Sequence, residues 1–225
     1  MKKIGIMSIP ENTEAILWDM DGVLIDSLGL DVRVVNELLE KYLGQRAGLS
    51  REYIASIFAY SIPEFWRLIF EKMSAELGIS SDGAFRDAVI GEYTALRQRY
   101  PFALIPGVTA ALADARMGEI KNAVVSNNLI AQTKEILART GIIDDFDLVV
   151  GNDSASGLKN KPAPDMYSYA LAQLNVDPKN SVVVEDSLIG AEAGKRAGCF
   201  VVGTSSGSLT KEQLIASSRL FDLIL

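Results

Sequence analysis

Histidine is absent from the 225-residue sequence, and this absence removes several kinds of active site at once. Ser-His-Asp and Cys-His catalysis both need an imidazole, and so do the commonest zinc sites. Any acid–base chemistry must therefore use carboxylates, lysine or tyrosine. Cysteine occurs once, as Cys199, so an internal disulfide is excluded, which is typical of a protein from a reducing compartment. Its apolar neighbours predict a buried thiol that packs as a small hydrophobic side chain.

Long apolar runs and an excess of basic charge are missing as well. No segment approaches the length that spans a bilayer, and the apolar stretch after Lys2 and Lys3 ends at Ser8, too early for a signal peptide. Lys and Arg number 22 against 29 Asp and Glu, a net charge of −7. This balance argues against a nucleic-acid or anionic-membrane surface, but not against one local phosphate site. We expect a cytoplasmic protein that binds neither nucleic acid nor membrane, monomeric or weakly dimeric.

The most informative stretch is residues 15–27, a short apolar run that ends in carboxylates and a glycine. The run predicts a buried parallel strand that is covered on both faces. Because side chains alternate along a strand, Asp19 and Asp21 would project to the same side, where their oxygens suit Mg²⁺. Gly22 would let the chain turn sharply beside a ligand. The alternative is a solvated Asp-x-Asp-Gly turn, and this stretch alone does not decide between the two.

Helical spacing of apolar residues dominates residues 28–102, where the pattern predicts four helices and no strand. From Ile105 onward helices and strands alternate, which is typical of a parallel α/β sheet. The simplest architecture is a doubly wound, Rossmann-like core of residues 1–27 and 103–225. An all-helical domain of residues 28–102 would be inserted after its first strand.

Three later segments place polar side chains at predicted strand ends, the edge at which open α/β sheets bind ligands. Ser126 and Asn127 could bind an anion, although on this segment alone N-capping of the next helix is the better explanation. Lys161 precedes a Pro-Ala-Pro-Asp turn whose prolines would fix where its side chain can reach, and a lysine brought to a phosphate would neutralise charge there. Glu185 and Asp186 end a β-branched strand and could either cap the following helix or supply metal ligands.

Taken together, these segments resemble the four motifs of the haloacid dehalogenase superfamily, in its phosphatase and β-phosphoglucomutase-like branch. The four similar segments are residues 19–27, Ser126 with its neighbour Asn127, Lys161 before Pro-Ala-Pro-Asp, and residues 181–187. The predicted helical insertion comes directly after the first motif, where this family carries its helical cap. The resemblance therefore implies a core domain with an inserted cap.

The resemblance also implies an enzyme that uses Mg²⁺ to hydrolyse a small phosphorylated metabolite, such as a sugar phosphate or phosphoglycolate, through an aspartyl-phosphate. Asp19 would be the nucleophile, and Asp21 would be the general acid and base. The implied metal ligands are four acidic residues: Asp19, Asp21, Glu185 and Asp186. The phosphorylated substrate would be held by residues of the first three motifs: Gly22, Ser126, Asn127 and Lys161.

In this family the cap selects the substrate, particularly at the turn between its early helices. Tyr60 and Ser61 occupy that place, and we expect them to contact the substrate. Phe65 and Trp66 follow closely, and their spacing indicates core positions within the cap instead.

Three alternatives remain open. A phosphomutase of the β-phosphoglucomutase-like branch usually carries a histidine a few residues into the cap, and Asp31 stands at that position here. Dehalogenases of the family lack the second aspartate and need no Mg²⁺, so Asp21 and Asp186 argue against that activity. A catalytically silent binding protein on the same fold would differ from an enzyme in having no turnover of any phosphate ester.

Overall fold

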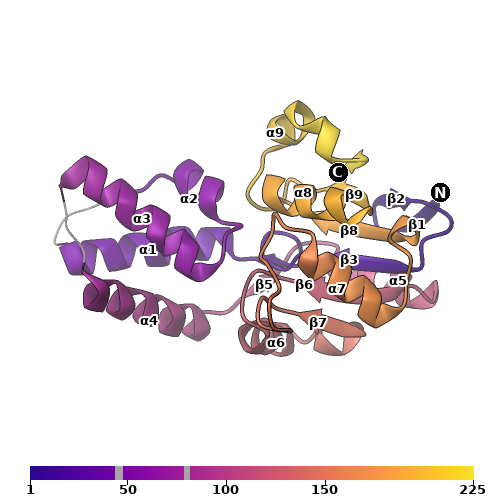
Figure 1. The fold of residues 1–225 in the computed structure, drawn as a ribbon, viewed down its shortest axis with the longest axis horizontal. Coiled ribbons are helices and arrows are strands. Elements are labelled where there is room, and N and C mark those ends of the chain that lie inside the picture. Colours follow the sequence, from indigo (N-terminus) through magenta and orange to yellow (C-terminus); the bar gives the residue numbers. More distant parts are fainter. Residues whose placement is uncertain (44–47, 79–81) are drawn as a thin grey trace. The chain divides into compact units, whose positions relative to one another are not determined.

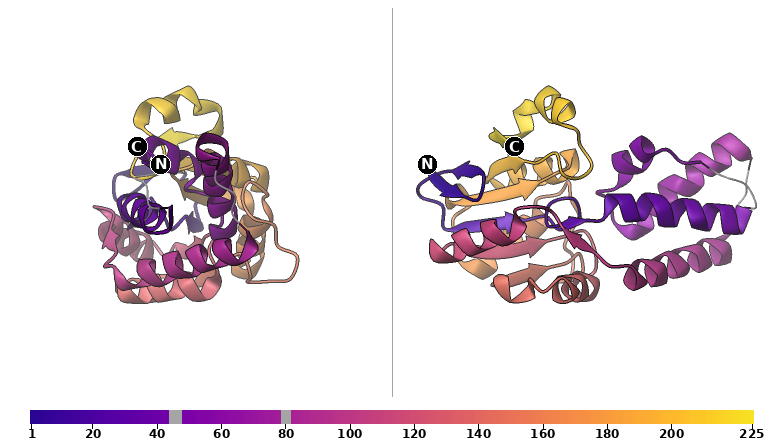
Figure 2. Two further views of the ribbon diagram at one scale, coloured as in Figure 1. Left: turned by 90° about the vertical axis from the view of Figure 1, so that its left-hand side faces the viewer. Right: turned by 180° about the vertical axis from the view of Figure 1, so that it is seen from behind.

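The computed structural model describes residues 1–43, 48–78 and 82–225, which form two compact units. The α/β unit comprises Met1–Asp26 and Phe102–Leu225. The helical unit comprises Ser27–Pro101, and its described residues form helices and no strand. Figures 1 and 2 show the sheet of the α/β unit with helices on both of its faces.

The α/β unit is built on a six-stranded sheet in which every neighbouring pair is parallel, in the order β10-β9-β8-β3-β6-β7. The strands of this unit are β1 (Lys2–Ile4), β2 (Met7–Ile9), β3 (Ala15–Trp18), β4 (Ile25–Asp26), β5 (Ala103–Leu104), β6 (Lys121–Val125), β7 (Leu148–Val150), β8 (Ser181–Glu185), β9 (Phe200–Gly203) and β10 (Leu223–Ile224). Its helices are α5 (Val108–Met117), α6 (Ile130–Arg139), α7 (Asp165–Leu174), α8 (Leu188–Ala197) and α9 (Lys211–Ala216), with short 3₁₀ turns η1 (Ile143–Asp145), η2 (Pro178–Asn180) and η3 (Ser218–Leu220). The predicted doubly wound parallel sheet is confirmed.

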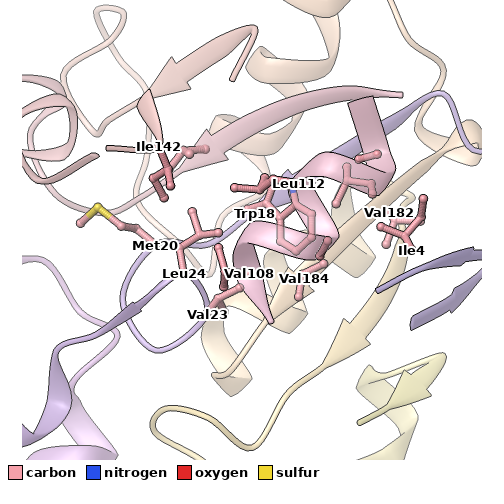
Figure 3. Packing of buried hydrophobic residues seen from close by; sticks show 14 of the residues in the cluster. Ile4, Trp18, Met20, Val23, Leu24, Val108, Leu112, Ile142, Val182 and Val184 are labelled. Atoms are coloured by element: carbon pink, nitrogen blue, oxygen red, sulfur yellow. The ribbon is translucent and has the colours of Figure 1, made fainter. Parts of the chain in front are cut away.

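The side chains of β3 alternate between the two faces of the sheet, and each face carries its own apolar core. Ile16 and Trp18 pack with residues of α5 and α6, and Figure 3 shows Trp18 among the labelled side chains of α5 and the neighbouring strands. Ala15 and Leu17 pack on the opposite face with residues of α7 and α8. This second core contains Cys199, whose burial raises the pKa of its thiol to about 11, so the predicted buried thiol is confirmed. β3 is therefore covered on both faces, as its apolar run predicted.

The first residues of the chain form an antiparallel hairpin of β1 and β2. Ile4, Met7 and Ile9 are buried in the same core as α5. The backbone N–H of Gly5 donates to Asp114 Oδ2 on α5 at 2.8 Å. The sequence pattern did not predict this hairpin, because each of its strands is only three residues long.

The helical unit consists, over its described residues, of the four predicted helices: α1 (Leu28–Leu43), α2 (Arg51–Ile57), α3 (Ile62–Leu77) and α4 (Gly83–Arg99). Phe65 and Trp66 are buried in its apolar core, which confirms their predicted core positions. Pro63 lies in the first turn of α3, and Gly78 ends that helix with a left-handed backbone at φ 65°. Among the described helices of both units, none is long and apolar enough to cross a membrane.

A buried ion pair ties the two ends of the helical unit together. Asp31 in the first turn of α1 accepts a hydrogen bond from Arg97 Nε of α4 at 2.7 Å. The same oxygen, Asp31 Oδ1, accepts a second bond from the hydroxyl of Tyr93 at 2.9 Å. Asp31 is therefore bonded to α4, at the position where the resembled mutase pattern has a histidine.

Candidate active site

The carboxyl end of β3 places the first two aspartates at the edge of the sheet. Asp19 follows β3 directly, and its N–H donates to the carbonyl of Val184 on β8 at 3.0 Å. Met20 is fully buried, and its carbonyl accepts from the N–H groups of Leu24 and Ile25, which closes a tight turn. Asp19 and Asp21, on either side of this anchored residue, are both half-buried.

Gly22 lies in that turn with φ at 86°, a conformation that favours glycine. A Cβ atom at this position would collide with the carboxylate of Asp186 and would lie 2.8 Å from Gly207 Cα. The segment after β9 therefore runs directly against the turn after β3. Ser206 Oγ donates to the carbonyl of Gly22 at 2.6 Å, and the N–H of Ser208 donates to Asp186 Oδ2 at 2.6 Å. Because Gly22 and Gly207 have no side chains, the loop after β9 can approach closely enough to bond both the carbonyl of Gly22 and the carboxylate of Asp186.

Lys161 is the buried cation of the site. Its ammonium carries three N–H donors, and it bonds three acceptors: Asp19 Oδ1 at 2.6 Å, Glu185 Oε1 at 2.7 Å and the carbonyl of Val125 at 2.8 Å. Burial alone would lower the pKa of Lys161, but the carboxylates of Asp19 and Glu185 favour the charged form more strongly and raise the pKa. Lys161 is therefore held as an ammonium against the predicted nucleophile.

Three of the predicted metal ligands come together. Asp19, Glu185 and Asp186 can each offer one carboxylate oxygen, and these atoms lie within 4.8 Å of one another. Burial raises the pKa of Asp19 well above its ordinary value, and the charges of Glu185 and Asp186 add to this rise against the opposing effect of Lys161. Burial, with the charge of Glu185, raises the pKa of Asp186 to about 7, although the hydrogen bonds from Ser208 oppose the rise.

This excess of negative charge fits a divalent cation. Three carboxylates face one ammonium, and burial makes uncompensated carboxylates costly to ionise. Hard oxygen ligands of this kind bind Mg²⁺ or a similar ion. The carboxylate of Asp21 is not part of this group, and its Oδ2 accepts a hydrogen bond from Asn128 Nδ2 at 2.7 Å.

Glu185 is held by more than Lys161. Its Oε1 also accepts a bond from the hydroxyl of Tyr167 on α7 at 2.8 Å, and its Oε2 accepts one from Ser187 Oγ at 2.9 Å. Burial and the negative charge of Glu185 raise the pKa of the Tyr167 hydroxyl, which keeps it a donor. The N-cap of α8 is Ser187, which accepts the N–H of Gly190, so neither Glu185 nor Asp186 serves as that cap.

Ser126 and Asn127 also do not cap the next helix. The N-cap position of α6 is Leu129, which makes no side-chain capping bond. Ser126 Oγ instead accepts the N–H of Asn128 at 3.2 Å, so its own hydroxyl hydrogen can still be donated. Asn127 Oδ1 accepts the backbone N–H of Lys161 at 3.0 Å. This turn therefore links the ends of β6 and β3 to the Lys161 segment.

Sequence reasoning missed three residues that hold the site: Asn128, Tyr167 and Ser208. Asn128 follows two predicted site residues, and its amide could have been recognised as a possible partner for a carboxylate. Tyr167 lies two residues into α7, where an apolar neighbour pattern gives no sign of a buried hydroxyl contact. Ser208 stands in a Ser-rich loop that reads as an ordinary turn.

The predicted substrate residues Tyr60 and Ser61 lie in the helical unit. Tyr60 is half-buried beside the apolar core of that unit, and Ser61 is 8% exposed at the N-cap of α3. Ser61 makes no side-chain capping bond there. Their contact with a substrate stays a prediction.

Comparison with known proteins gives consistent relationships. Residues 16–204 match the family model described as haloacid dehalogenase-like hydrolase. The chain is 30% identical over 203 residues to β-phosphoglucomutase of Bacillus subtilis (strain 168), which covers 86% of this chain and 84% of that protein. It is 28% identical over 198 residues to phosphoglycolate phosphatase of Nitrosospira multiformis, with 87% and 84% covered. A crystal structure of a predicted phosphoglycolate phosphatase from Haemophilus somnus has the same fold, with a TM-score of 0.83 at 24% identity, covering 95% of this chain and 93% of that one.

Proposed function

The chain belongs to the haloacid dehalogenase-like hydrolases, and we propose that it is a Mg²⁺-dependent phosphatase of small phosphate monoesters, such as sugar phosphates or phosphoglycolate. The observation that carries this proposal is the group of Asp19, Glu185 and Asp186, in which Asp19 and Glu185 also bond the ammonium of the buried Lys161. The phosphatase and phosphomutase names of the similar proteins support phosphoryl transfer as the reaction class.

Asp19 is the nucleophile of the proposed reaction. Lys161 bonds its Oδ1 at 2.6 Å, so Oδ2 is the oxygen that attacks phosphorus. The bond from Oδ2 to phosphorus forms as the bond from phosphorus to the leaving alcohol oxygen breaks, which leaves an acyl phosphate on Asp19. Because Lys161 holds the carboxylate from the other side, the nucleophile needs little reorganisation before it attacks.

Asp21 is the general acid and base. Its protonated carboxyl gives a proton to the leaving alcohol oxygen in the first step. In the second step its carboxylate takes a proton from a water molecule, whose oxygen bonds phosphorus as the acyl phosphate breaks. Inorganic phosphate leaves, and Asp19 and Asp21 return to their starting forms.

Ser126 and Lys161 stabilise the charge on the transferring phosphoryl group. Ser126 is 3% exposed, and its hydroxyl retains a hydrogen to donate to a phosphoryl oxygen. The three N–H groups of Lys161 are already bonded, so its contribution is mainly its positive charge and its hold on Asp19. Gly22 lets the turn after β3 pack against Asp186 and Gly207, and Asn127 holds the Lys161 segment in place.

Asp19, Glu185 and Asp186 would hold Mg²⁺ through carboxylate oxygens, and Asp21 would add its main-chain carbonyl. When bound, Mg²⁺ polarises the phosphoryl group and offsets the charge of the three carboxylates. Glu185 would hold the ion together with Asp19 and Asp186. Its Oε1 also accepts hydrogen bonds from Lys161 and Tyr167, and its Oε2 accepts one from Ser187.

We assign residues 28–102 to a substrate-selecting cap. A cap of this kind excludes water and sets the size of the accepted substrate. Tyr60 and Ser61, at the turn before α3, are the residues to which we assign substrate contact. Exchanging them should reorder the preferred substrates, whereas a uniform loss on all substrates would contradict this assignment.

A phosphomutase is the second candidate, because the chain is 30% identical to a β-phosphoglucomutase. The residue at the expected histidine position, Asp31, is 1% exposed and bonded to Arg97 and Tyr93. A carboxylate engaged in this way does not replace an imidazole that shuttles protons. The hydrolase is therefore the better supported of the two.

The proposal is tested by measuring released phosphate from a panel of small phosphate monoesters with and without Mg²⁺. We expect turnover that is lost on exhaustive chelation and restored by Mg²⁺. Conversion of a sugar 1-phosphate to its 6-phosphate without phosphate release would favour the mutase. Full activity after chelation would overturn the proposal. No turnover of any phosphate ester would also overturn it and would favour a catalytically silent binding protein.

A further inference from the structure

The side chain of Asn128 contacts the proposed general acid directly. Its Nδ2 group donates to Asp21 Oδ2 at 2.7 Å, across 107 positions of sequence. Asn128 is 9% exposed, whereas Asp21 is only half-buried. The more deeply buried Asn128 can therefore hold the carboxylate of Asp21 in one orientation.

Asn128 is itself held from two sides. Its backbone N–H donates to Ser126 Oγ at 3.2 Å, and its carbonyl accepts the N–H of Asn152 at 2.9 Å. The segment after β7 also packs closely here, because a Cβ atom on Gly151 would lie 2.8 Å from the carbonyl oxygen of Asn128. A side chain on so constrained a backbone presents its amide in a defined direction.

The chemistry of the amide determines which oxygen of Asp21 can carry a proton. An amide NH₂ group donates hydrogen bonds and does not accept them, so Asp21 Oδ2 must be the acceptor. The carbonyl oxygen of a protonated carboxyl group is its stronger acceptor, so a hydrogen bond to Oδ2 favours the hydrogen on Oδ1. We infer that Asn128 is a positioning residue for Asp21 and makes Oδ1 the oxygen that transfers protons.

This inference rests on the proposed phosphatase activity and specifies its proton path. Asp21 Oδ1 gives its hydrogen to the leaving alcohol oxygen as the bond from that oxygen to phosphorus breaks. The same oxygen later accepts a hydrogen from the attacking water. The bond from Asn128 to Oδ2 persists through both steps, so the carboxyl group does not need to reorient between them.

The neighbouring asparagine shows that this contact is specific to position 128. Asn127 uses its amide oxygen to accept the backbone N–H of Lys161, whereas Asn128 uses its amide nitrogen to donate to a side-chain carboxylate. The two adjacent amides thus act on different parts of the site. Replacing Asn128 should change proton transfer without changing the hold on Lys161.

The test compares wild type with Asn128→Leu and Asn128→Asp on two substrates, an alkyl phosphate and 4-nitrophenyl phosphate, with Mg²⁺ present. Asn128→Leu removes the hydrogen-bond donor and keeps a side chain of similar shape. Asn128→Asp, which keeps the volume of Asn, is the second variant in case Asn128→Leu fails to fold. We expect kcat for the alkyl phosphate to fall about 10–10²-fold with KM little changed, and kcat for the aryl phosphate to fall less than about threefold. Asn12→Leu, at an exposed position bonded to Asn180, is the matched control and should leave both rates unchanged.

Two further readouts separate positioning from a structural role. The Asp21→Asn/Asn128→Leu double variant should be no slower on the alkyl phosphate than Asp21→Asn alone, because Asn128 acts through Asp21. Calorimetric binding of Mg²⁺ to Asn128→Leu should match wild type. Equal losses on both substrates, additive losses in the double variant, or weakened Mg²⁺ binding would overturn the inference while the wild-type activity stands. A wild type that turns over no phosphate ester would overturn the proposed function, and this inference with it.

Discussion

The α/β unit and the helical unit both bury charged side chains, and the two groups differ in how their charges are matched. In the helical unit, Asp31 and Arg97 bond at 2.7 Å with side chains only 1% and 8% exposed. In the described part of the α/β unit, the carboxylates of Asp19, Glu185 and Asp186 face the ammonium of Lys161.

The difference separates a structural ion pair from a site that needs a further cation. A buried pair of opposite charges is stable only while both partners are present. A buried group with surplus negative charge gains stability when a cation binds or when one carboxylate is neutralised. Removing Asp31 should therefore destabilise the helical unit, whereas neutralising one carboxylate of the Asp19, Glu185 and Asp186 group should not destabilise the metal-free α/β unit.

The largest effect is expected from Asp19→Asn, which should reduce turnover by roughly 10⁴–10⁶-fold because an amide cannot attack phosphorus. In the metal-free protein, the same change should leave the free energy of unfolding unchanged or higher, since it neutralises one of the three carboxylates. Phosphate release and urea unfolding of the same preparation measure both effects. A metal-free variant that is markedly less stable than wild type would break the comparison.

The opposite effect on stability is expected in the helical unit. Asp31→Asn leaves Arg97 buried without its charged partner and should lower the free energy of unfolding by about 3–5 kcal/mol. The double variant Asp31→Leu/Arg97→Met should recover most of this loss, because it removes both charges. If the single and double variants are equally unstable, packing and not charge matching determines the stability of this pair.

Mg²⁺ should stabilise the α/β unit specifically. At a concentration about 100 times its Kd, a ligand that binds only the folded state adds about 2.7 kcal/mol to the free energy of unfolding. We expect the thermal midpoint of wild type to rise with Mg²⁺ and that of Asp186→Asn to rise much less. Ca²⁺ and Na⁺ at matched ionic strength are the controls, and equal stabilisation by Na⁺ would indicate simple screening.

The surplus negative charge should also make the free energy of unfolding of the metal-free protein depend on pH. Asp186 has a pKa of about 7 in the folded protein against an ordinary value of 3.8. Between these values the folded state binds more protons than the unfolded state, so this contribution to stability is complete below pH 3.8 and is lost as the pH rises to about 7. We expect metal-free wild type to lose stability relative to Asp186→Asn across this window. A constant difference between the two proteins would contradict the raised pKa.

The smallest effect is expected from Tyr167→Phe, which removes one hydrogen bond to Glu185. The loss of stability should be about 1 kcal/mol, because a buried carboxylate loses one of its donors. The apparent affinity for Mg²⁺ should fall about 10-fold, since groups that hold metal ligands commonly affect affinity by that amount. Tyr169→Phe, on the same helix but without a bond to Glu185, is the matched control. Unchanged Mg²⁺ affinity would show that Tyr167 supports only packing.

Local sequence patterns predicted the parts of this protein that depend on short-range chemistry. The apolar run before Asp19 predicted β3, and the change of periodicity after residue 102 predicted the alternating elements of the α/β unit. The position of Lys161 next to the carboxylates followed from the rule that ligand sites lie at the carboxyl edge of a parallel sheet. The roles assigned to these residues stay predictions.

The contacts that complete the site could not be predicted in the same way. Asn128 meets Asp21, and Ser208 meets Asp186, across long stretches of chain whose approach depends on how strands and loops pack. The passage of Gly207 against Gly22 is a fit between two backbones. The sequence predicted the sharp turn at Gly22, but it gave no sign that Gly207 would pack against that turn. The pairing of Asp31 with Arg97 likewise depends on the meeting of α1 and α4.

The short ladder of β4 and β5 has a consequence for how such a protein can evolve. Ile25 pairs with Leu104, and Asp26 pairs with Ala103, so the chain leaves and re-enters the α/β unit through one antiparallel ribbon. Opposite residues in such a ribbon have Cα atoms about 4.5–5.5 Å apart. A segment whose ends lie this close together can be inserted, exchanged or shortened without displacing the strands of its host. If the helical unit selects the substrate as proposed, this ribbon lets one continuous stretch be exchanged for another while the proposed phosphoryl-transfer residues of the α/β unit are kept.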